Sequence, residues 1–227
     1  MSALKKLLLN RYSVRQFLNK PVEKSVLREL LSDAALSPSG TNIQPWKLHI
    51  LSSNKIEQLE ERVLAEIKHS PQGQQTDIGV YPKNMPADYN QRRKECGLTL
   101  YEGIGLSRDD TLGRNKQMAK NANFFGASTG IVFTVDKAAT EMQILDCGIY
   151  IQSLMLLAHE KGLGTCAQGF WTLWPTIIKQ LLSKENPSIN NDIVITGLAI
   201  GYPDDNAKVN SVRQKRLPVD EFCFFYE

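Results

Sequence analysis

The chain has 227 residues, of which 42% are hydrophobic and 22% are charged, and its formal net charge is +3 at pH 7. This composition is typical of a globular chain that buries a sizeable core, as one large domain or two small ones. The charge is too small, and the basic residues are too scattered, to predict a nucleic-acid-binding protein.

Targeting, membrane and metal signals are weak. The apolar part of the N-terminus is only Leu7–Leu9, shorter than the ~7 residues that a signal peptide needs, and no apolar run approaches the ~18 residues of a membrane span. The four cysteines have no CxxC spacing, and the three histidines form no HExxH motif, so no metal site is expected. Unpaired cysteines are typical of a reducing compartment, which predicts a cytoplasmic protein.

Hydrophobic periodicity predicts many helices and few strands. Helices are expected at 2–10, 23–36, 55–68, 87–101, about 110–124, 141–161 and 175–183, with Asn54 and Asp109-Asp110 as caps of the third and fifth. Strands are expected at 46–51, 130–135 and 192–200, and residues 164–170 form a short strand or a loop. This order predicts an α+β fold, in which a small mixed, mainly antiparallel sheet packs among long helices.

Two segments do not fit this regular pattern. Residues 70–125 form an irregular, partly helical insertion, which in a compact domain is usually functional or disordered. Tyr81 and Tyr89 can pack, so we favour a functional insertion that covers an active site. The chain ends in Phe222-Cys-Phe-Phe-Tyr226, which is too apolar to stay free, and we expect an extra strand on its own subunit or on a partner.

A basic strip follows the first helix. In extended backbone, Arg11, Ser13 and Arg15 point to one face, where two guanidiniums and a hydroxyl could bind a phosphate. The plain alternative is two surface arginines beside a capping serine, and the pattern alone does not exclude it.

The segment Pro38–Trp46 places small and amide side chains between prolines. Asn42 and Gln44 each offer donors and acceptors that match the alternating edge of a pyrimidine-type ring. The alternative is an ordinary turn before a strand, with Trp46 in the core.

Two later segments add to this pattern. Gly164–Gly169 has small residues where a backbone N–H could approach a ligand, although a plain helix-to-strand connection would look the same. Val212–Pro218 is a second basic cluster, which could meet the first at one phosphate or remain a solvated charge run. Cys166 has no histidine near it in sequence, and no GxSxG motif is present, so nucleophilic catalysis is not expected.

Taken together, these pieces resemble the nitroreductase family of FMN-dependent oxidoreductases over nearly the whole chain. The motifs that carry the resemblance are Arg11-Tyr-Ser-Val-Arg15-Gln-Phe17, Pro38-Ser-Gly-Thr-Asn-Ile-Gln-Pro-Trp46, Gly164-Thr165, Gly201-Tyr202-Pro203 and Arg216-Leu-Pro-Val-Asp220. Residues 101–127 are similar to the branch with nitrobenzene and nitrobenzoate reductases.

The resemblance implies a single FMN-binding domain over 1–227 and an intertwined homodimer with exchanged C-terminal tails. Around each FMN it implies Arg11, Tyr12, Ser13 and Arg15 from one subunit, and Pro38, Ser39, Gly40, Asn42 and Gln44 from the other. It also implies Ala167, Gln168 and Gly169 beside flavin N5, with Arg213 and Arg216 near the phosphate.

The match is incomplete at a few positions. Gln214 and Gln168 stand where many relatives carry lysine and glutamate, and either Asn121 or Asn123 could be the usual asparagine near the flavin. Four aromatic residues could line the substrate space or belong to the core: Tyr89, Phe124, Trp171 and Trp174.

The implied activity is reduction of nitroaromatic or quinone-type acceptors by NAD(P)H in a ping-pong reaction through FMN N5. No side chain is expected to be catalytic, because the flavin carries the chemistry. Two alternatives remain: a related flavoprotein that dehalogenates or oxidises, and a flavin-binding module without turnover.

Overall fold

The structure is a computed structural model that describes residues 1–227. Its helices are α1 (Ala3–Asn10), α2 (Lys24–Ala34), α3 (Ser53–Ile67), α4 (Ala87–Gly103), α5 (Thr111–Ala119), α6 (Glu141–Glu160), α7 (Pro175–Leu182) and α8 (Lys208–Ser211). Short 3₁₀ helices are η1 (Gly40–Asn42), η2 (Lys120–Gly126), η3 (Gly169–Leu173), η4 (Pro187–Asn191) and η5 (Val219–Glu221). The strands are β1 (Lys47–Leu51), β2 (Thr129–Asp136), β3 (Gly164–Gln168) and β4 (Asp192–Gly201).

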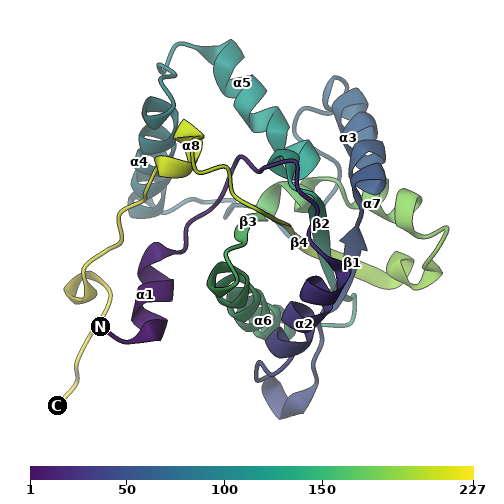
Figure 1. The fold of residues 1–227 in the computed structure, drawn as a ribbon, viewed down its shortest axis with the longest axis horizontal. Coiled ribbons are helices and arrows are strands. Elements are labelled where there is room, and N and C mark those ends of the chain that lie inside the picture. The colour runs from purple at the N-terminus through teal and green to yellow at the C-terminus, as the bar shows by residue number, and fades with distance from the viewer.

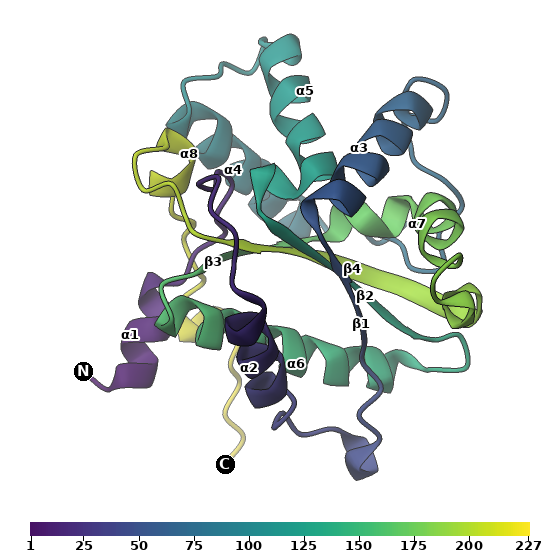
Figure 2. The same cartoon turned by 45° about the vertical axis from the view of Figure 1, so that its right-hand side comes forward.

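The strands form one four-stranded antiparallel sheet in the order β1-β2-β4-β3. Helices α2 and α6 cover one face, and α3 and α7 lie on the other (Figures 1 and 2). β3 is therefore an edge strand, and it lies near the end of α6. The expected α+β architecture is confirmed, and the sheet itself is antiparallel throughout.

Side chains of the central strands alternate between two cores, as the period of a strand requires. In β2, Val132 packs in the core beneath α3 and α7, whereas Ile131 and Phe133 pack in the core beneath α2 and α6. Gly197 in β4 leaves room for the buried ring of Trp171, because a Cβ at this position would lie 2.1 Å from that ring. The sheet is thus buried on both faces, and its β3 edge is available for a site.

The expected helices and strands are present, and their boundaries agree within about two residues except at the end of α5. The N-cap of α3 is Ser52 and not Asn54, whose side chain instead accepts a hydrogen bond from Gln58. Asp110 does cap α5, since its Oδ1 accepts from the N–H of Gly113 at 2.8 Å. The helix expected to reach residue 124 ends at Ala119.

The segment that follows α5 leaves helical geometry at two phenylalanines. Phe124 and Phe125 adopt left-handed backbone conformations, with φ of 52° and 58°, which no α-helix accommodates. This turn lets the ring of Phe124 stack on Trp171, with centroids 4.6 Å apart. Tertiary packing therefore overrides helix propensity in this segment.

The apolar C-terminal end does not add a strand to its own subunit. Both chain ends lie on one side of the molecule (Figure 1), and Phe224, Phe225 and Tyr226 are 74%, 82% and 93% exposed. The expectation of an extra strand is therefore wrong for the chain's own sheet. None of the helices combines the length and the apolar character that a membrane crossing requires.

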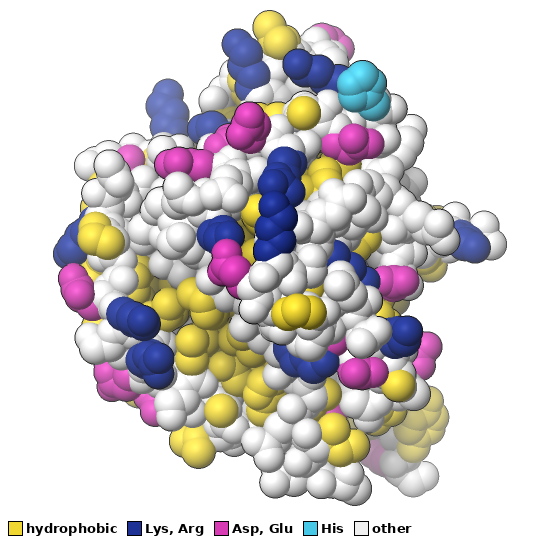
Figure 3. All heavy atoms as spheres, turned by 90° about the vertical axis from the view of Figure 1, so that its right-hand side faces the viewer, with side chains coloured by type: hydrophobic (Ala, Val, Ile, Leu, Met, Phe, Trp, Pro, Cys, Tyr) yellow, Lys and Arg dark blue, Asp and Glu magenta, His cyan; other side chains and the backbone are white.

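One face of the surface is shown in Figure 3. Charged side chains of both signs are interspersed on it, and apolar side chains form a continuous hollowed area between them. Helix α6 leaves a row of apolar side chains uncovered, with Met142 at 62%, Leu145 at 59% and Ile149 at 38% exposure. Exposed apolar areas of this kind mark interaction surfaces.

Candidate cofactor site

The segment after α1 lies along the β3 edge of the sheet. Ser13 forms a parallel bridge with Thr165, and the N–H of Val14 donates to the Thr165 carbonyl at 2.9 Å. The side chain of Val14 occupies the space above Gly164, where a Cβ would lie 2.5 Å from it. Beyond Thr165 the strand is more open, because Ala167 is exposed. The segment therefore covers only the first half of this edge.

Arg11, Ser13 and Arg15 share a neighbour on β3. Burial raises the pKa of the Cys166 thiol, and Arg15, Ser13 and Arg11 all lie close enough to it to lower that pKa in part. The side chain of Arg15 also donates to the Ser13 carbonyl at 3.3 Å. The three residues of the strip are thus brought together at the start of the exposed edge.

Arg11 is close to a second arginine from the far end of the chain. Burial lowers the pKa of Arg11, and the positive charge of Arg216 lowers it further. Neither guanidinium has a carboxylate within 4.0 Å. Two uncompensated like charges repel each other, and an anion between them would remove that repulsion.

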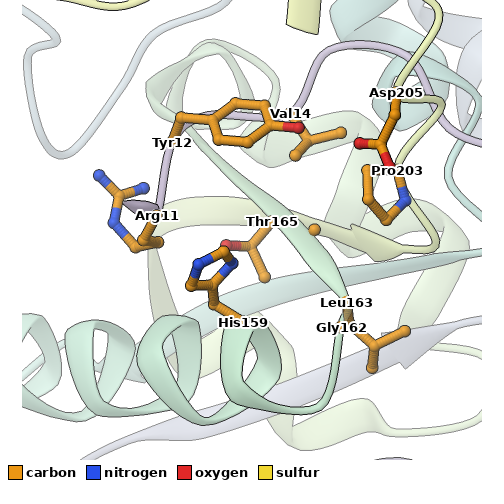
Figure 4. Close-up of a pocket in the computed structure, with 10 residues that line it drawn as sticks. Arg11, Tyr12, Val14, His159, Gly162, Leu163, Thr165, Pro203 and Asp205 are labelled. Atoms are coloured by element: carbon orange, nitrogen blue, oxygen red, sulfur yellow. The ribbon is translucent and has the colours of Figure 1, made fainter. Parts of the chain in front are cut away.

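Arg11 also lies beside a cavity of about 220 Å³ between β3 and the end of α6 (Figure 4). The His159 ring rises from α6 toward β3, where the hydroxyl of Thr165 faces it, and Arg11 lies beside the ring with its guanidinium directed away from it. Burial, and then the Arg11 charge, lower the pKa of His159. The Thr165 hydroxyl is buried without a hydrogen-bond partner. This end of the site is therefore polar and favours an anion.

Arg213 is placed differently from Arg216. Its guanidinium lies 3.7 Å from the centre of the Tyr12 ring, and its Nη1 donates to the carbonyl of Asn210 at 2.6 Å. Burial, followed by the charge of Asp205, raises the pKa of Tyr12. Arg213 and Tyr12 thus fix the chain ends to each other, while Arg216 joins Arg11.

Sequence reasoning missed the residue that holds these segments together. The Asn210 side chain is 2% exposed, its Oδ1 accepts from the N–H of Arg15 at 2.8 Å, and its Nδ2 donates to the carbonyl of Gln16 at 2.7 Å. One amide therefore satisfies backbone groups 195 and 194 residues away. An isolated asparagine carries no sequence signal for such a contact.

At the other end of β3, Gln168 forms hydrogen bonds with only one of the two candidate asparagines. Its Nε2 donates to the carbonyl and to the Oδ1 of Asn121, at 3.0 and 3.1 Å. Asn123 instead lies near the carboxylate of Glu60, on the side of α3, where it lowers a pKa that burial raises. Only Asn121 therefore reaches the Gln168–Gly169 end of the edge. The Gln168 Oε1 is buried without a partner, and Gly169 beside it is exposed.

The segment 38–46 forms a strained loop. Thr41, Asn42 and Gln44 have φ of 48°, 60° and 52°, and such left-handed conformations are costly for residues other than glycine, above all for a β-branched threonine. Ser39 helps to hold the loop, because its Oγ accepts from the N–H of Gln44 at 2.9 Å. Residues that persist in strained conformations often serve a binding site.

A buried carboxylate on α6 anchors this loop. Both oxygens of Asp146 accept from the N–H of Gly40, at 3.3 and 3.2 Å, and Asp146 is 6% exposed. Sequence reasoning did not single out Asp146, although a carboxylate within the apolar run Ile144–Tyr150 was the available signal. The loop is thus held at the beginning of α6.

The two halves of the expected site do not meet within one chain. Asp146 and the loop lie at one end of α6, and His159 and Arg11 lie near the other, thirteen residues along the helix. At a rise of 1.5 Å per residue this is about 20 Å. Ser39, Asn42 and Gln44 therefore cannot complete the cluster of Arg11, Ser13 and Arg15 in the same subunit.

Most of the aromatic candidates belong to the core. Phe124 and Trp171 are 0% exposed and Trp174 is 1% exposed, so none of them lines an open space. Tyr89, in contrast, is 53% exposed on α4. The core interpretation is therefore correct for three of the four.

The residues present fit an anionic, planar cofactor such as FMN. The unpaired cations Arg11 and Arg216 suit its phosphate, the orphaned Gln168 Oε1 can accept from a ring N–H, and the exposed backbone at Ala167 leaves room for a ring.

Comparisons with known proteins agree with this geometry. Residues 8–202 match the model of the nitroreductase family. The chain is 31% identical over 216 residues to a 4-nitrobenzoate reductase of Pseudomonas putida, which covers 95% of this chain and 92% of that protein. Among solved structures, the FMN- and NADPH-dependent nitroreductase NfnB from Sphigopyxis sp. strain HMH is 30% identical, with a TM-score of 0.93 over 100% of both chains.

A second NfnB, from Mycobacterium smegmatis, was solved in complex with NADPH. It is 26% identical, with a TM-score of 0.89 over 98% of this chain and 97% of that one. The protein belongs to the nitroreductase family.

Proposed function

We propose that this protein is an FMN-dependent oxidoreductase that uses NAD(P)H to reduce nitroaromatic or quinone-type acceptors in a ping-pong reaction. The observation that carries the proposal is the pair of uncompensated cations, Arg11 and Arg216, at the head of an edge strand whose far end is open. The relatives named as nitrobenzoate reductase and as FMN- and NADPH-dependent nitroreductase support the reaction class.

In this proposal the residues around β3 have separate roles. Arg11 and Arg216 bind the phosphate, with Ser13 as a further donor. Ala167, Gln168 and Gly169 border the ring, and Asn121 orients the Gln168 amide through the hydrogen bond at 3.1 Å. Tyr12 and Arg213 position the two segments through their stacked contact at 3.7 Å.

Bound FMN would supply the hydride transfer through its N5 position. The protein provides fixed charge for this chemistry. Arg15 holds a guanidinium beside β3, against the Ser13 carbonyl at 3.3 Å, where its charge would stabilise negative charge on a bound flavin. No side chain has to transfer a proton to N5 for this role, so we assign no catalytic residue.

We further propose that the active form is a homodimer in which each loop of Pro38, Ser39, Gly40, Asn42 and Gln44 serves the partner's flavin. The separation of about 20 Å along α6 supports this crossing. The exposed apolar row on α6 provides a surface for the partner, and the exposed Phe224–Tyr226 end provides a segment that can be exchanged. A two-fold axis would place both contacts in each subunit.

The proposal treats 1–227 as one domain, in which the insertion at about 70–125 covers the active site. The insertion is anchored beside the site, because the N–H of Gln74 donates to the Leu173 carbonyl at 2.8 Å. Its side-chain Oε1 accepts from the N–H of Thr176 at 3.1 Å. Four free cysteines support a cytoplasmic location.

The test uses the purified protein with FMN, under anaerobic conditions. We expect a yellow protein that is bleached by NADPH or NADH and that regains its colour when a nitroaromatic or quinone is added. A colourless protein that binds no FMN would contradict the proposal. A yellow protein that nicotinamides do not bleach would favour a different reaction of the superfamily, and flavin binding without turnover would favour a carrier.

A further inference from the structure

A second polar site lies in the insertion, in a groove between α4 and α5 with a volume of about 480 Å³. We name it the basic groove, and define it by Tyr81, Arg93, Lys94, Tyr101, Arg108 and Arg114. Two carboxylates, Glu95 and Glu102, also line it, so that the four cations leave a positive excess. None of these cations has a carboxylate within 4.0 Å.

Tyrosine rings hold the two central guanidiniums of the basic groove. Arg114 lies 4.4 Å from the centre of the Tyr101 ring, and Arg93 lies 5.3 Å from that of Tyr81. Arg114 uses its Nη1 to donate to the Arg108 carbonyl at 3.1 Å, and Arg93 uses its Nη2 to donate to the Asn90 Oδ1 at 3.1 Å. A guanidinium placed over a ring keeps its remaining in-plane N–H groups for an anion, and a phosphate accepts such donors in pairs. The groove thus presents pre-positioned phosphate donors, and neither Glu95 nor Glu102 is close enough to form an ion pair with them.

Two contacts place the basic groove next to the exposed end of β3. On one wall, Met118 of the groove accepts at its carbonyl from the Asn121 side chain at 2.9 Å, and Asn121 in turn binds Gln168. On the other, Tyr81 follows Val80, whose Cγ1 lies 3.5 Å from the Cβ position of Gly169. A ligand seated at Gln168–Gly169 could therefore extend into the groove.

The distance from the Gln168 end of β3 to Arg114 indicates how long a ligand must be to reach both. Arg114 precedes Asn121 by seven residues along α5 and η2, which is about 10 Å or more. An acceptor of a single aromatic ring at Gln168 would end before it reaches Arg114. A nicotinamide dinucleotide can span this path, with its ring at the flavin and its adenosine end among the arginines.

We propose that the basic groove binds the adenosine-phosphate end of the dinucleotide, and that Arg93 and Arg114 contact the 2′-phosphate that distinguishes NADPH from NADH. This inference rests on the proposed function. It makes the protein selective for NADPH, because an uncharged 2′-hydroxyl leaves the guanidiniums without their anion. The residues involved lie outside the flavin site, so that flavin binding and dinucleotide selection can be separated by mutation.

The experiment measures equilibrium binding to the FMN-loaded protein, without turnover. The probes are adenosine 2′,5′-bisphosphate and adenosine 5′-monophosphate, studied by isothermal titration calorimetry at one ionic strength. We expect the bisphosphate to bind about tenfold more tightly or better, as charge-assisted hydrogen bonds to one phosphate predict. Arg93→Gln and Arg114→Gln should each reduce this ratio, and the double variant should abolish it.

Two matched variants control for charge and fold. Arg92→Gln removes a neighbouring arginine of α4 that is paired with Asp88 at 2.6 Å, and Lys116→Gln removes an exposed cation of α5 that does not line the groove. Both should keep the wild-type ratio. In steady-state assays Arg114→Gln should raise the KM for NADPH about tenfold and leave the kcat and the KM for NADH unchanged.

Equal binding of the two probes to the wild-type protein would overturn the inference, and so would an equal loss in the control variants. FMN content and melting temperature are measured for every variant, so that loss of fold is recognised. If NADPH bleaches the flavin but Arg93→Gln and Arg114→Gln do not change the ratio of the two probe affinities, the role of the basic groove is refuted and the proposed function remains. Failure of any nicotinamide to bleach the flavin would instead refute the proposed function.

Discussion

Asp146 and His159 lie thirteen residues apart on α6, and each lies beside one of the two groups of candidate cofactor residues. Asp146 holds the loop of Gly40 through the backbone N–H, whereas His159 lies beside Arg11. Close to Asp146 on the same helix, Leu145 and Ile149 expose apolar side chains. In a two-fold dimer whose α6 helices run antiparallel, the loop end of one helix would lie near the arginine end of the other. The helix would then set the distance between the two sites.

Asp146 should control flavin affinity without touching the flavin. Replacing Asp146 with Ala removes the charged acceptor of the Gly40 N–H, and a hydrogen bond to a charged group contributes about 1.5–3 kcal/mol. The strained loop of Thr41 and Asn42 then relaxes. We expect FMN to dissociate about tenfold more readily in Asp146→Ala, as measured by recovery of flavin fluorescence.

Asp146→Asn is the matched control, because its side-chain oxygen still accepts from Gly40. It should retain near wild-type affinity for FMN and a melting temperature close to that of the wild type. Equal FMN affinity in the wild type and in Asp146→Ala would show that the loop does not contribute to the flavin site.

Away from the site, His49 links stability to pH. Its Nε2 is 3.0 Å from the Thr134 hydroxyl, which donates to the buried Asp192 at 2.9 Å. Since that hydroxyl gives its one proton to Asp192, neutral His49 must carry its proton on Nε2. Burial lowers the pKa of His49 below its ordinary 6.5, and the charge of Asp192 offsets only part of this effect.

The sign of the pH effect follows from this lowered pKa. The unfolded chain takes up a proton on His49 near the ordinary value of 6.5, at which the folded chain still resists it. The stabilising contribution of His49 is therefore complete above this pH and is lost as the pH falls below it. His49→Gln keeps a donor for Thr134 and cannot titrate, so its free energy of unfolding should fall less between pH 7.5 and pH 5.5.

Denaturant unfolding at both pH values, in the wild type and in His49→Gln, measures the difference. Parallel loss of stability in both proteins would mean that His49 does not bind its proton differently in the folded and unfolded states.

The regular parts of this chain could be predicted because their signals are local. The long helix α6 begins at a Thr140–Gln143 capping box and ends before Gly162, whose φ is +73°. Its periodicity and its caps agree, and the sequence analysis places both ends within one residue. The strip of Arg11, Ser13 and Arg15 is equally local, since alternation in extended backbone determines its common face.

Other features depend on contacts between distant residues, which leave little local signal. The left-handed Phe124 that ends the α5 region is stabilised by stacking on Trp171. Trp171 and Trp174 are aromatic residues of the kind that often line substrate pockets, but both lie in the core. The role of Asn210 requires a contact across 195 residues. Sequence reasoning identified the residues with suitable chemistry, and tertiary packing decides which of them face the site.

The separation of Arg11 from the loop of Asn42 makes a specific prediction for mixed dimers. If each flavin uses Arg11 of one subunit and Asn42 of the other, Arg11→Ala and Asn42→Ala homodimers each have two damaged sites. A heterodimer of the two variants has one intact site and one that carries both lesions.

The decisive measurement is therefore the FMN content of this heterodimer, purified with a different affinity tag on each variant chain. The crossed site predicts one tightly bound FMN per two chains, and NADPH should bleach it at the wild-type rate. A heterodimer that binds no FMN more tightly than either homodimer would show that Arg11 and Asn42 of the same chain serve the same flavin, and would contradict the crossed site.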